Sequence, residues 1–152
     1  MINIFNDDFQ DFIKAFIKNE VKYVLVGGYS VVAHGYRRST GDMDLLVERS
    51  VENYHRIMNS FNEFGMPVFD MTQSSFLSDK YDVFSFGRPP AAIDIMTKIK
   101  GAEFDEIFLH AQLHEIDGIQ VRVIHLRQLI KTKKASGRHK DLDDIENLEN
   151  NS

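Results

Sequence analysis

Two aspartates separated by one apolar residue, Asp42 and Asp44, are the side chains in this sequence best suited to chemistry. Residues two apart in a β-strand point to the same face, so in a strand both carboxylates lie together. Neighbouring carboxylates repel each other unless a cation lies between them. Because Mg²⁺ prefers a few carboxylates together with substrate phosphates, the pair predicts a site for Mg²⁺ or Mn²⁺. The plainer alternative is a solvated strand end.

A glycine pair, Gly27-Gly28, lies shortly before these aspartates, between an expected strand and an expected helix. Glycines without side chains let a phosphate approach the backbone, and the N-terminus of a helix adds free N–H donors and a favourable dipole. Alone, such a pair is usually only a tight turn. Together with Asp42 and Asp44, it predicts a site that holds a triphosphate and its metal ions.

The order of these two features resembles the signature of the polymerase-β-like nucleotidyltransferase superfamily. That signature is an apolar residue, Gly-Gly or Gly-Ser, a spacer, and then Asp-apolar-Asp-apolar, which Asp42-Met43-Asp44-Leu45 matches. Further residues are similar to the small AbiEii-like nucleotidyltransferases of the abortive-infection group: Tyr29, Ser30, His34, Gly35, Tyr36, Arg38, Thr40, Lys134 and the segment 137–145. The resemblance covers most of the chain and implies a nucleotidyltransferase fold and activity.

Members of that superfamily carry a third acid on a later strand, and Asp94 is our candidate for it. It lies within the apolar run 91–96, where a buried charge is costly unless it is paired or bound to a metal. The alternative is that Asp94 lies at an exposed strand edge beside a lysine. Asp82 is the competing candidate, at a position more typical of a turn. We therefore expect Asp42, Asp44 and Asp94 to be the metal ligands and catalytic acids.

The C-terminal part of the chain is rich in cations, with Lys131, Lys133, Lys134, Arg138 and Lys140 followed by an acidic stretch at 141–149. For most of them a solvated helix pair with compensating charges is the expected role. By the resemblance, Lys134 and Arg138 are the first candidates for contact with the triphosphate, and Lys131 is a possible substitute. Lys133 lies about 100° around the helix from Lys134, so we expect Lys133→Ala to have little effect on NTP binding.

Two residues just before the aspartates, Arg38 and Thr40, are also candidates for phosphate binding. For Arg38 the alternative is a surface ion pair worth about 0–1 kcal/mol. The predicted nucleotide-binding set is therefore Gly27, Gly28, Arg38, Thr40, Lys134 and Arg138.

The spacing of apolar residues predicts an α+β fold, with a mixed β-sheet flanked by helices. We expect strands at 21–26, 43–47, 82–86, 92–96, 113–116 and 119–123, and helices after Asn6, at 29–36, from Ser50 to Gly65, and at 103–109, 126–134 and 140–148. Asp117-Gly118 predicts a tight hairpin. Residues 67–80 are expected to be loop with at most one short element, and 88–90 a connection. The whole chain, 1–152, is predicted to be one domain that residues 125–152 close with helices.

The composition excludes several classes of protein. The 152 residues contain no cysteine, so no disulfide or thiolate metal site can form. No stretch approaches the roughly 20 apolar residues needed to cross a bilayer, and residues 1–11 show no leader pattern. A net charge of −5 argues against a general nucleic-acid coat, although a local basic groove is compatible with it. We expect a cytoplasmic protein that does not bind membranes.

The expected reaction is transfer of a nucleoside monophosphate from an NTP to an acceptor, with release of pyrophosphate. The acceptor is left open between a tRNA end, a protein side chain and a small hydroxyl compound. Because the resembling group includes toxins of toxin–antitoxin pairs, an antitoxin partner or a homodimer is a possible source of further binding surface. The competing hypothesis is a non-catalytic nucleotide-binding or interaction module with the same fold.

Overall fold

The computed structural model describes residues 3–36, 40–68, 70–87 and 92–150. The strands are β1 (Tyr23–Val26), β2 (Met43–Val47), β3 (Val83–Phe86), β4 (Ile93–Met96), β5 (Gln112–Ile116) and β6 (Ile119–Val123). The helices are α1 (Asp7–Lys18), α2 (Gly27–Ala33), α3 (Val51–Phe64), α4 (Gln73–Leu77), α5 (Phe104–His110), α6 (Leu126–Ser136) and α7 (His139–Asn150).

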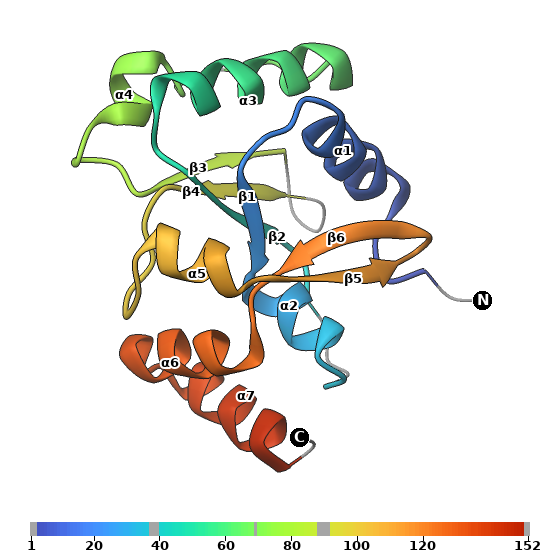
Figure 1. The fold of residues 1–152 in the computed structure, drawn as a ribbon, viewed down its shortest axis with the longest axis vertical. Coiled ribbons are helices and arrows are strands. Elements are labelled where there is room, and N and C mark those ends of the chain that lie inside the picture. The colour runs from blue at the N-terminus through green and yellow to red at the C-terminus, as the bar shows by residue number, and fades with distance from the viewer. Residues whose placement is uncertain (1–2, 37–39, 69, 88–91, 151–152) are drawn as a thin grey trace.

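The strands of the described chain form one mixed sheet in the order β3-β4-β2-β1-β6-β5. Strand β2 pairs antiparallel with β1 and parallel with β4, and β3 and β5 are the two edges. Figure 1 shows α1 and α3 along one side of the sheet and α6 and α7 on the other, next to α2. The central strands β1 and β2 therefore lie between the α1–α3 side and the α6–α7 side of the molecule.

Aromatic side chains fill the core between the sheet and the pair α1 and α3. Phe61 of α3 lies 5.2 Å from Phe12 of α1 and 4.6 Å from Phe86 of β3, measured between ring centroids. Phe12 and Phe16 of α1 are both fully buried. Their spacing of four residues places them on one face of the helix, which is the periodicity that the sequence shows.

Short-range signals set the element boundaries. The side chains of Asn6 and Ser50 accept hydrogen bonds from the first turns of α1 and α3, and Gly65 ends α3 in the left-handed conformation. Asp117 and Gly118 have φ of 52° and 80°, which lets β5 turn directly into β6.

The predicted fold class, a mixed sheet flanked by helices, is confirmed. Each expected strand is present, and helix α2 begins at Gly27 itself, two residues before the expected start. The uncertain stretch 67–80 contains the short helix α4, which Thr72 caps. The expected connection at 88–90 lies outside the described residues. No helix within the described ranges is long and apolar enough to pass through a bilayer.

One buried amide, that of Asn53 in α3, joins the helix to the two central strands. Its Oδ1 accepts from the Lys22 backbone N–H at 2.8 Å, and its Nδ2 donates to the carbonyls of Lys22 at 3.1 Å and Glu48 at 2.8 Å. Lys22 precedes β1 and Glu48 follows β2. The amide thereby holds the ends of both strands opposite the candidate site.

We predict that Asn53→Ala lowers the free energy of unfolding by about 2–3 kcal/mol, because it leaves buried backbone groups without partners. Urea unfolding measures this loss. The matched control is Asn59→Ala, an exposed position on the same helix, which we expect to be neutral. Equal stability of the two variants would show that water replaces the Asn53 amide.

Candidate active site

The register of the sheet brings two of the predicted acids together. Strands β2 and β4 are parallel neighbours, and Asp44 lies directly opposite Asp94. Asp42 immediately precedes β2 and is close enough to raise the pKa of the Asp44 carboxyl. The structure therefore gathers Asp42, Asp44 and Asp94 at one place on the sheet.

The competing acid, Asp82, lies elsewhere. Ser85 is the β3 residue opposite Asp94, and Asp82 precedes it by three positions, which is about 10 Å along a strand. Asp82 is exposed, and its backbone carbonyl accepts from the Thr97 N–H at 2.9 Å. Its surroundings are those of a strand end, apart from the other acids.

Burial and like charge act strongly on Asp44. Burial first, then the charge of Asp94 and a hydrogen bond with it, and then the charge of Asp42, raise the pKa of the Asp44 carboxyl to about 7, while Lys140 opposes this rise. Asp94 is itself held by Ser85, whose hydroxyl donates to Asp94 Oδ1 at 2.6 Å. At neutral pH the Asp44 carboxyl therefore retains a proton for part of the time.

These residues fit a divalent cation. No group of three His, Asp or Glu side chains in the described ranges is arranged as a ready-made metal cage. Asp44 and Asp94 nevertheless offer two neighbouring carboxylates, which is the incomplete donor set that Mg²⁺ takes when substrate phosphates supply further oxygens. A cation held by these two carboxylates would remove the repulsion between them.

Gly27 packs directly against the Asp44 carboxylate. Its φ is +70°, and a Cβ built on it overlaps Asp44 Oδ2. Glycine is therefore required at this position on both counts. Gly28 follows within α2 and is buried. Ser30 donates to the Gly27 carbonyl at 2.6 Å and so stabilises the turn from β1 into α2.

A narrow cleft of about 100 Å³ lies beside this contact, between the sheet and α6. Its polar lining includes Gly27, Asp44, Lys133, Arg138 and Asp141, and its apolar lining comes from β1, β4 and α6. The cleft brings together three residues predicted from the sequence, one from each of the segments that carry the resemblance: Gly27, Asp44 and Arg138.

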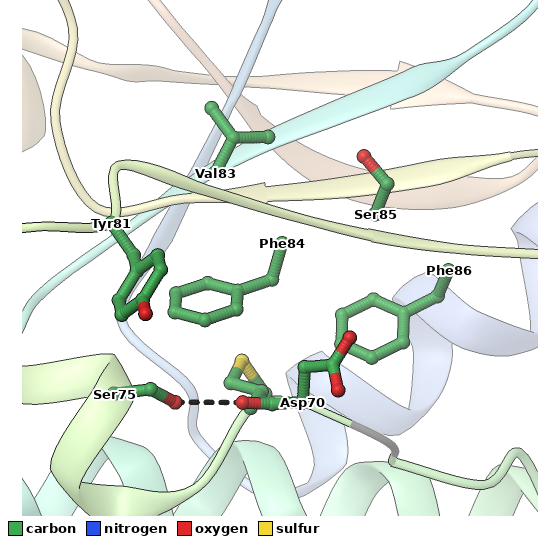
Figure 2. Close-up of a pocket in the computed structure, with 8 residues that line it drawn as sticks. Asp70, Ser75, Tyr81, Val83, Phe84, Ser85 and Phe86 are labelled. Atoms are coloured by element: carbon green, nitrogen blue, oxygen red, sulfur yellow. Dashed lines mark hydrogen bonds between the residues drawn. The ribbon is translucent and has the colours of Figure 1, made fainter.

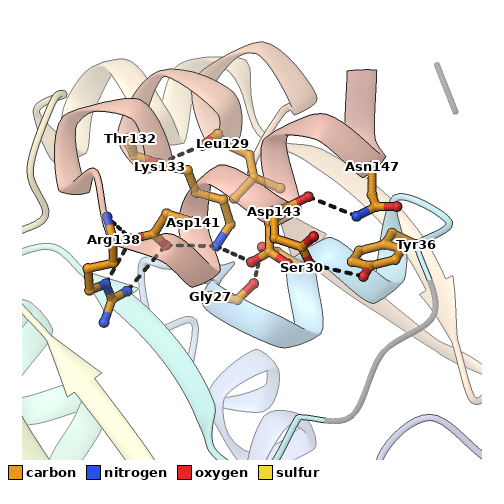
Figure 3. A network of polar contacts seen from close by, with 11 residues as sticks. Gly27, Ser30, Tyr36, Leu129, Thr132, Lys133, Arg138, Asp141, Asp143 and Asn147 are labelled. Carbon is orange, nitrogen blue, oxygen red and sulfur yellow. Dashed lines mark hydrogen bonds and ion pairs between the residues drawn. The ribbon is translucent and has the colours of Figure 1, made fainter. Parts of the chain in front are cut away.

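Arg138 is held at the mouth of the cleft by Asp141 (Figure 3). Its Nε donates to Asp141 Oδ2 at 2.8 Å, and its Nη2 donates to Oδ1 at 3.3 Å. These bonds, and more weakly the charge of Asp44, raise the pKa of Arg138 above its ordinary value. Burial acts to raise the pKa of Asp141, but Arg138 and Lys133 together hold it below its usual range.

Lys133 is not one of the solvated helix cations that the sequence predicts, and its effect on NTP binding stays a prediction. Its side chain is only 7% exposed and lies 3.3 Å from Asp141 Oδ1 and 2.9 Å from Asp144 Oδ2. Lys133 therefore joins α6 to α7 through buried ion pairs. The sequence contains a signal for this pairing, since Asp141 and Asp144 are spaced to share one face of a helix.

The other predicted cations lie away from the cleft lining. Lys134 is 61% exposed and lies 3.6 Å from Glu149, and Lys131 lies 3.6 Å from Glu106. Lys140, which was not chosen from the sequence, is near enough to Asp44 to lower the pKa of that carboxyl. Thr40 is half-buried just before Asp42, and Arg38 lies outside the described residues.

Residues 6–151 match the model of a family described as nucleotidyl transferase of unknown function (DUF2204). No curated protein matches the sequence. The nucleotidyltransferase resemblance stated from the sequence is thereby confirmed.

The fold is similar to solved nucleotidyltransferase structures. The lincosamide antibiotic adenylyltransferase LnuA, solved with lincomycin bound, gives a TM-score of 0.64 at 15% identity and covers 99% of this chain and 100% of its own. A protein from Thermotoga maritima classed as a nucleotidyltransferase has a TM-score of 0.62 at 15% sequence identity. The alignment covers 95% of this chain and 91% of that protein. The antibiotic-resistance factor ANT(2'')-Ia has a TM-score of 0.62 at 14% sequence identity, and the alignment covers 93% of this chain and 80% of that protein. At these identities the likeness establishes the fold.

The buried position of Lys133 generates a stability prediction. Lys133→Met leaves the carboxylates of Asp141 and Asp144 without this cation, so we expect a loss of about 3–5 kcal/mol in the free energy of unfolding. Lys134→Met, one position along the same helix and exposed, is the matched control and should change stability by less than about 0.5 kcal/mol. Urea unfolding of both variants measures the difference, and similar values would contradict the buried pairing.

Proposed function

The chain belongs to the DUF2204 family of nucleotidyl transferases, and we propose that its reaction transfers a nucleoside monophosphate from an NTP to an acceptor hydroxyl at Asp42, Asp44 and Asp94. The observation that carries this proposal is the register of β2 and β4, which sets Asp44 opposite Asp94 beside the cleft that contains Gly27 and Arg138. The enzyme class rests on the family, and the residue roles rest on this geometry.

In the proposed reaction the acceptor oxygen attacks the α-phosphorus in line with the leaving group. A bond forms between that oxygen and the α-phosphorus, the bond to the oxygen that bridges the α- and β-phosphorus atoms breaks, and pyrophosphate leaves with the electron pair. Asp94, oriented by the Ser85 hydroxyl at 2.6 Å, accepts the proton of the acceptor. Mg²⁺ or Mn²⁺ bound at the acids supplies positive charge to the triphosphate and the developing oxyanion.

The chain's own cations hold the leaving phosphates. Arg138 is the first candidate, because its guanidinium lies at the cleft beside Asp44 and stays charged at any physiological pH. Lys140 is the second, since its charge acts on Asp44. Gly27 keeps the wall of the cleft free of a side chain. Thr40, Arg38, Gly28 and Lys134 remain candidates by the resemblance.

For the acceptor we favour a small hydroxyl compound. The structural alignment with LnuA, an antibiotic adenylyltransferase, covers all of LnuA and 99% of this chain. A domain of this size can therefore suffice for a small acceptor. The net charge of −5 disfavours a large polyanion such as tRNA. A tRNA end or protein side chain, in a toxin–antitoxin pair or homodimer, is the alternative. Because NTPs are intracellular, we place the enzyme in the cytoplasm.

Calorimetric titration with each of the four NTPs, with and without Mg²⁺, tests the acids. The wild type should bind at least one NTP more tightly when Mg²⁺ is present. Asp44→Asn and Asp94→Asn should abolish that gain, because each removes one of the two facing carboxylates. Asp82→Asn, at the far end of β3, is the matched control and should keep it.

The raised pKa of Asp44 also predicts how the Asp44→Asn substitution changes stability. Because the folded state raises the pKa of Asp44 from 3.8 to about 7, the metal-free protein binds extra protons and loses stability as the pH rises through that interval. Asp44→Asn removes this loss, so its melting temperature at pH 7 should equal or exceed that of the wild type. A wild type that binds no NTP would reject the proposed function, and unchanged Mg²⁺ dependence in both variants would reject the residue assignment.

Arg138 has a separate test. If its guanidinium contacts phosphate, Arg138→Ala should weaken NTP binding about tenfold to a hundredfold, as expected for a charge-assisted contact of about 1.5–3 kcal/mol. Arg127→Ala, an exposed arginine at the start of α6, is the control and should bind normally. Lys134→Ala distinguishes the two grounds for assigning residues to the phosphates. The family resemblance predicts weaker NTP binding by this variant, whereas the exposed position of Lys134 outside the cleft lining predicts normal binding. Normal binding by Arg138→Ala would leave Arg138 with a structural role alone.

A further inference from the structure

A second and larger cavity, of about 530 Å³, lies at the outer edge of β3, away from the cleft. Tyr81, Phe84 and Phe86 line it from the strand side. Asp70 and Met71 line it from the segment that leads into α4, and Ser75 lines it from α4 itself. Its volume falls in the range of small-molecule sites, and its lining has the composition of such sites, mostly aromatic and apolar with few polar groups.

The charge of this cavity differs from that of the cleft. Asp70 is the only charged side chain among its described lining residues, and no lysine or arginine contributes. In Figure 2 the carboxylate of Asp70 lies beneath the rings of β3. Tyr81, 51% exposed, offers a ring against which a flat ligand can stack, and a cation can lie over such a ring. The lining therefore suits a neutral or cationic ligand and disfavours a phosphate.

Ser85 connects the cavity to the acids. It forms part of the cavity wall, and its hydroxyl donates to Asp94 Oδ1 at 2.6 Å. Figure 2 shows Ser85 on the opposite side of β3 from Phe84 and Phe86, so a ligand reaches Asp94 by extending over the edge of one strand. Neighbouring strands lie about 5 Å apart, so Asp94 lies one strand spacing inward from Ser85 on the same face of the sheet.

The cavity and the cleft lie on opposite sides of the acids. In the sheet order β3-β4-β2-β1, Asp94 and Asp44 occupy β4 and β2, the cavity lies beyond β3, and the cleft begins at the end of β1. An in-line transfer requires the attacking oxygen and the leaving pyrophosphate on opposite sides of the α-phosphorus. This arrangement supplies both positions.

We propose that the cavity at β3 is the acceptor site, and that the acceptor is a small ring-containing compound with a hydroxyl and a basic amine. The amine lies at Asp70, the ring against Tyr81, and the hydroxyl extends past Ser85 to Asp94. The hydroxyl oxygen then forms the bond to the α-phosphorus, its proton passes to Asp94, and pyrophosphate leaves towards Arg138. This inference rests on the proposed function and names the substrate class.

Three probes that share a phenol ring and differ in the terminal group of a two-carbon side chain test the cavity without turnover: tyramine, which is cationic, tyrosol, which is neutral, and para-hydroxyphenylacetate, which is anionic. Binding to the metal-free protein is measured by ligand-observed NMR. We expect tyramine to bind most tightly, tyrosol less tightly and the anion most weakly. No binding by any probe, or a preference for the anion, would overturn the proposal.

Two variants locate the binding. Asp70→Asn should remove the preference for tyramine over tyrosol, a change of up to about fivefold for an exposed charge pair. Tyr81→Ala should weaken all three probes by about threefold to tenfold, the value of an aromatic contact. The matched controls are Glu115→Gln and Leu113→Ala, an exposed acid and an exposed apolar residue on the opposite sheet edge. Equal effects of variants and controls would place the probes elsewhere.

Paramagnetic Mn²⁺ with ATP separates this inference from the proposed function. With Mn²⁺–ATP bound at the acids, the resonances of bound tyramine should broaden, since this effect falls steeply with distance, and ATP should not displace the probe. If Mn²⁺–ATP binds and tyramine stays sharp or is displaced, the cavity is not the acceptor site. If Mn²⁺–ATP does not bind, the proposed function fails, and the acceptor assignment fails with it even where the probes bind the cavity.

Discussion

The placement of two carboxylates side by side, Asp44 and Asp94, is the constraint on which the rest of the structure depends. Like charges at neighbouring positions on parallel strands repel, and burial increases the cost, as the raised pKa of Asp44 shows. The hydrogen bonds of β1, β2 and β4 hold the pair in place, and Gly27 closes against Asp44 without a side chain. The repulsion between the two acids lowers the stability of the folded protein, and a cation bound at the proposed site would remove it.

Features that depend on a few neighbouring residues could be predicted from the sequence. The caps at Asn6 and Ser50 and the hairpin at Asp117-Gly118 are set by local backbone preferences, and each is found where expected. The spacing of Asp42 and Asp44 gives a similar local prediction, and Asp42, one residue before β2, acts through its charge on Asp44. The family can be recognised from the sequence because its signature is a short segment.

Features that depend on packing between distant segments could not be predicted with the same security. That Asp94 and not Asp82 faces Asp44 follows from the register of β3, β4 and β2, which no local pattern specifies. The angle between Lys133 and Lys134 was correct, but which of the two is buried is decided by α7 through Asp141 and Asp144. The period of a helix gives the angle between two of its side chains, but only the packing of the partner helix decides which of them is buried.

The distribution of charge around the acids explains how an acidic chain can act on a triphosphate. The net charge of −5 is a property of the whole surface, whereas binding depends on the local field. Arg138 and Lys140 act on Asp44 from the α6–α7 side, and Asp70 lies on the β3 side. Phosphates are thus attracted to one side and repelled from the other. In the proposed reaction, two substrates of opposite charge would therefore approach the same pair of carboxylates from opposite directions, which would keep the nucleotide out of the acceptor's place.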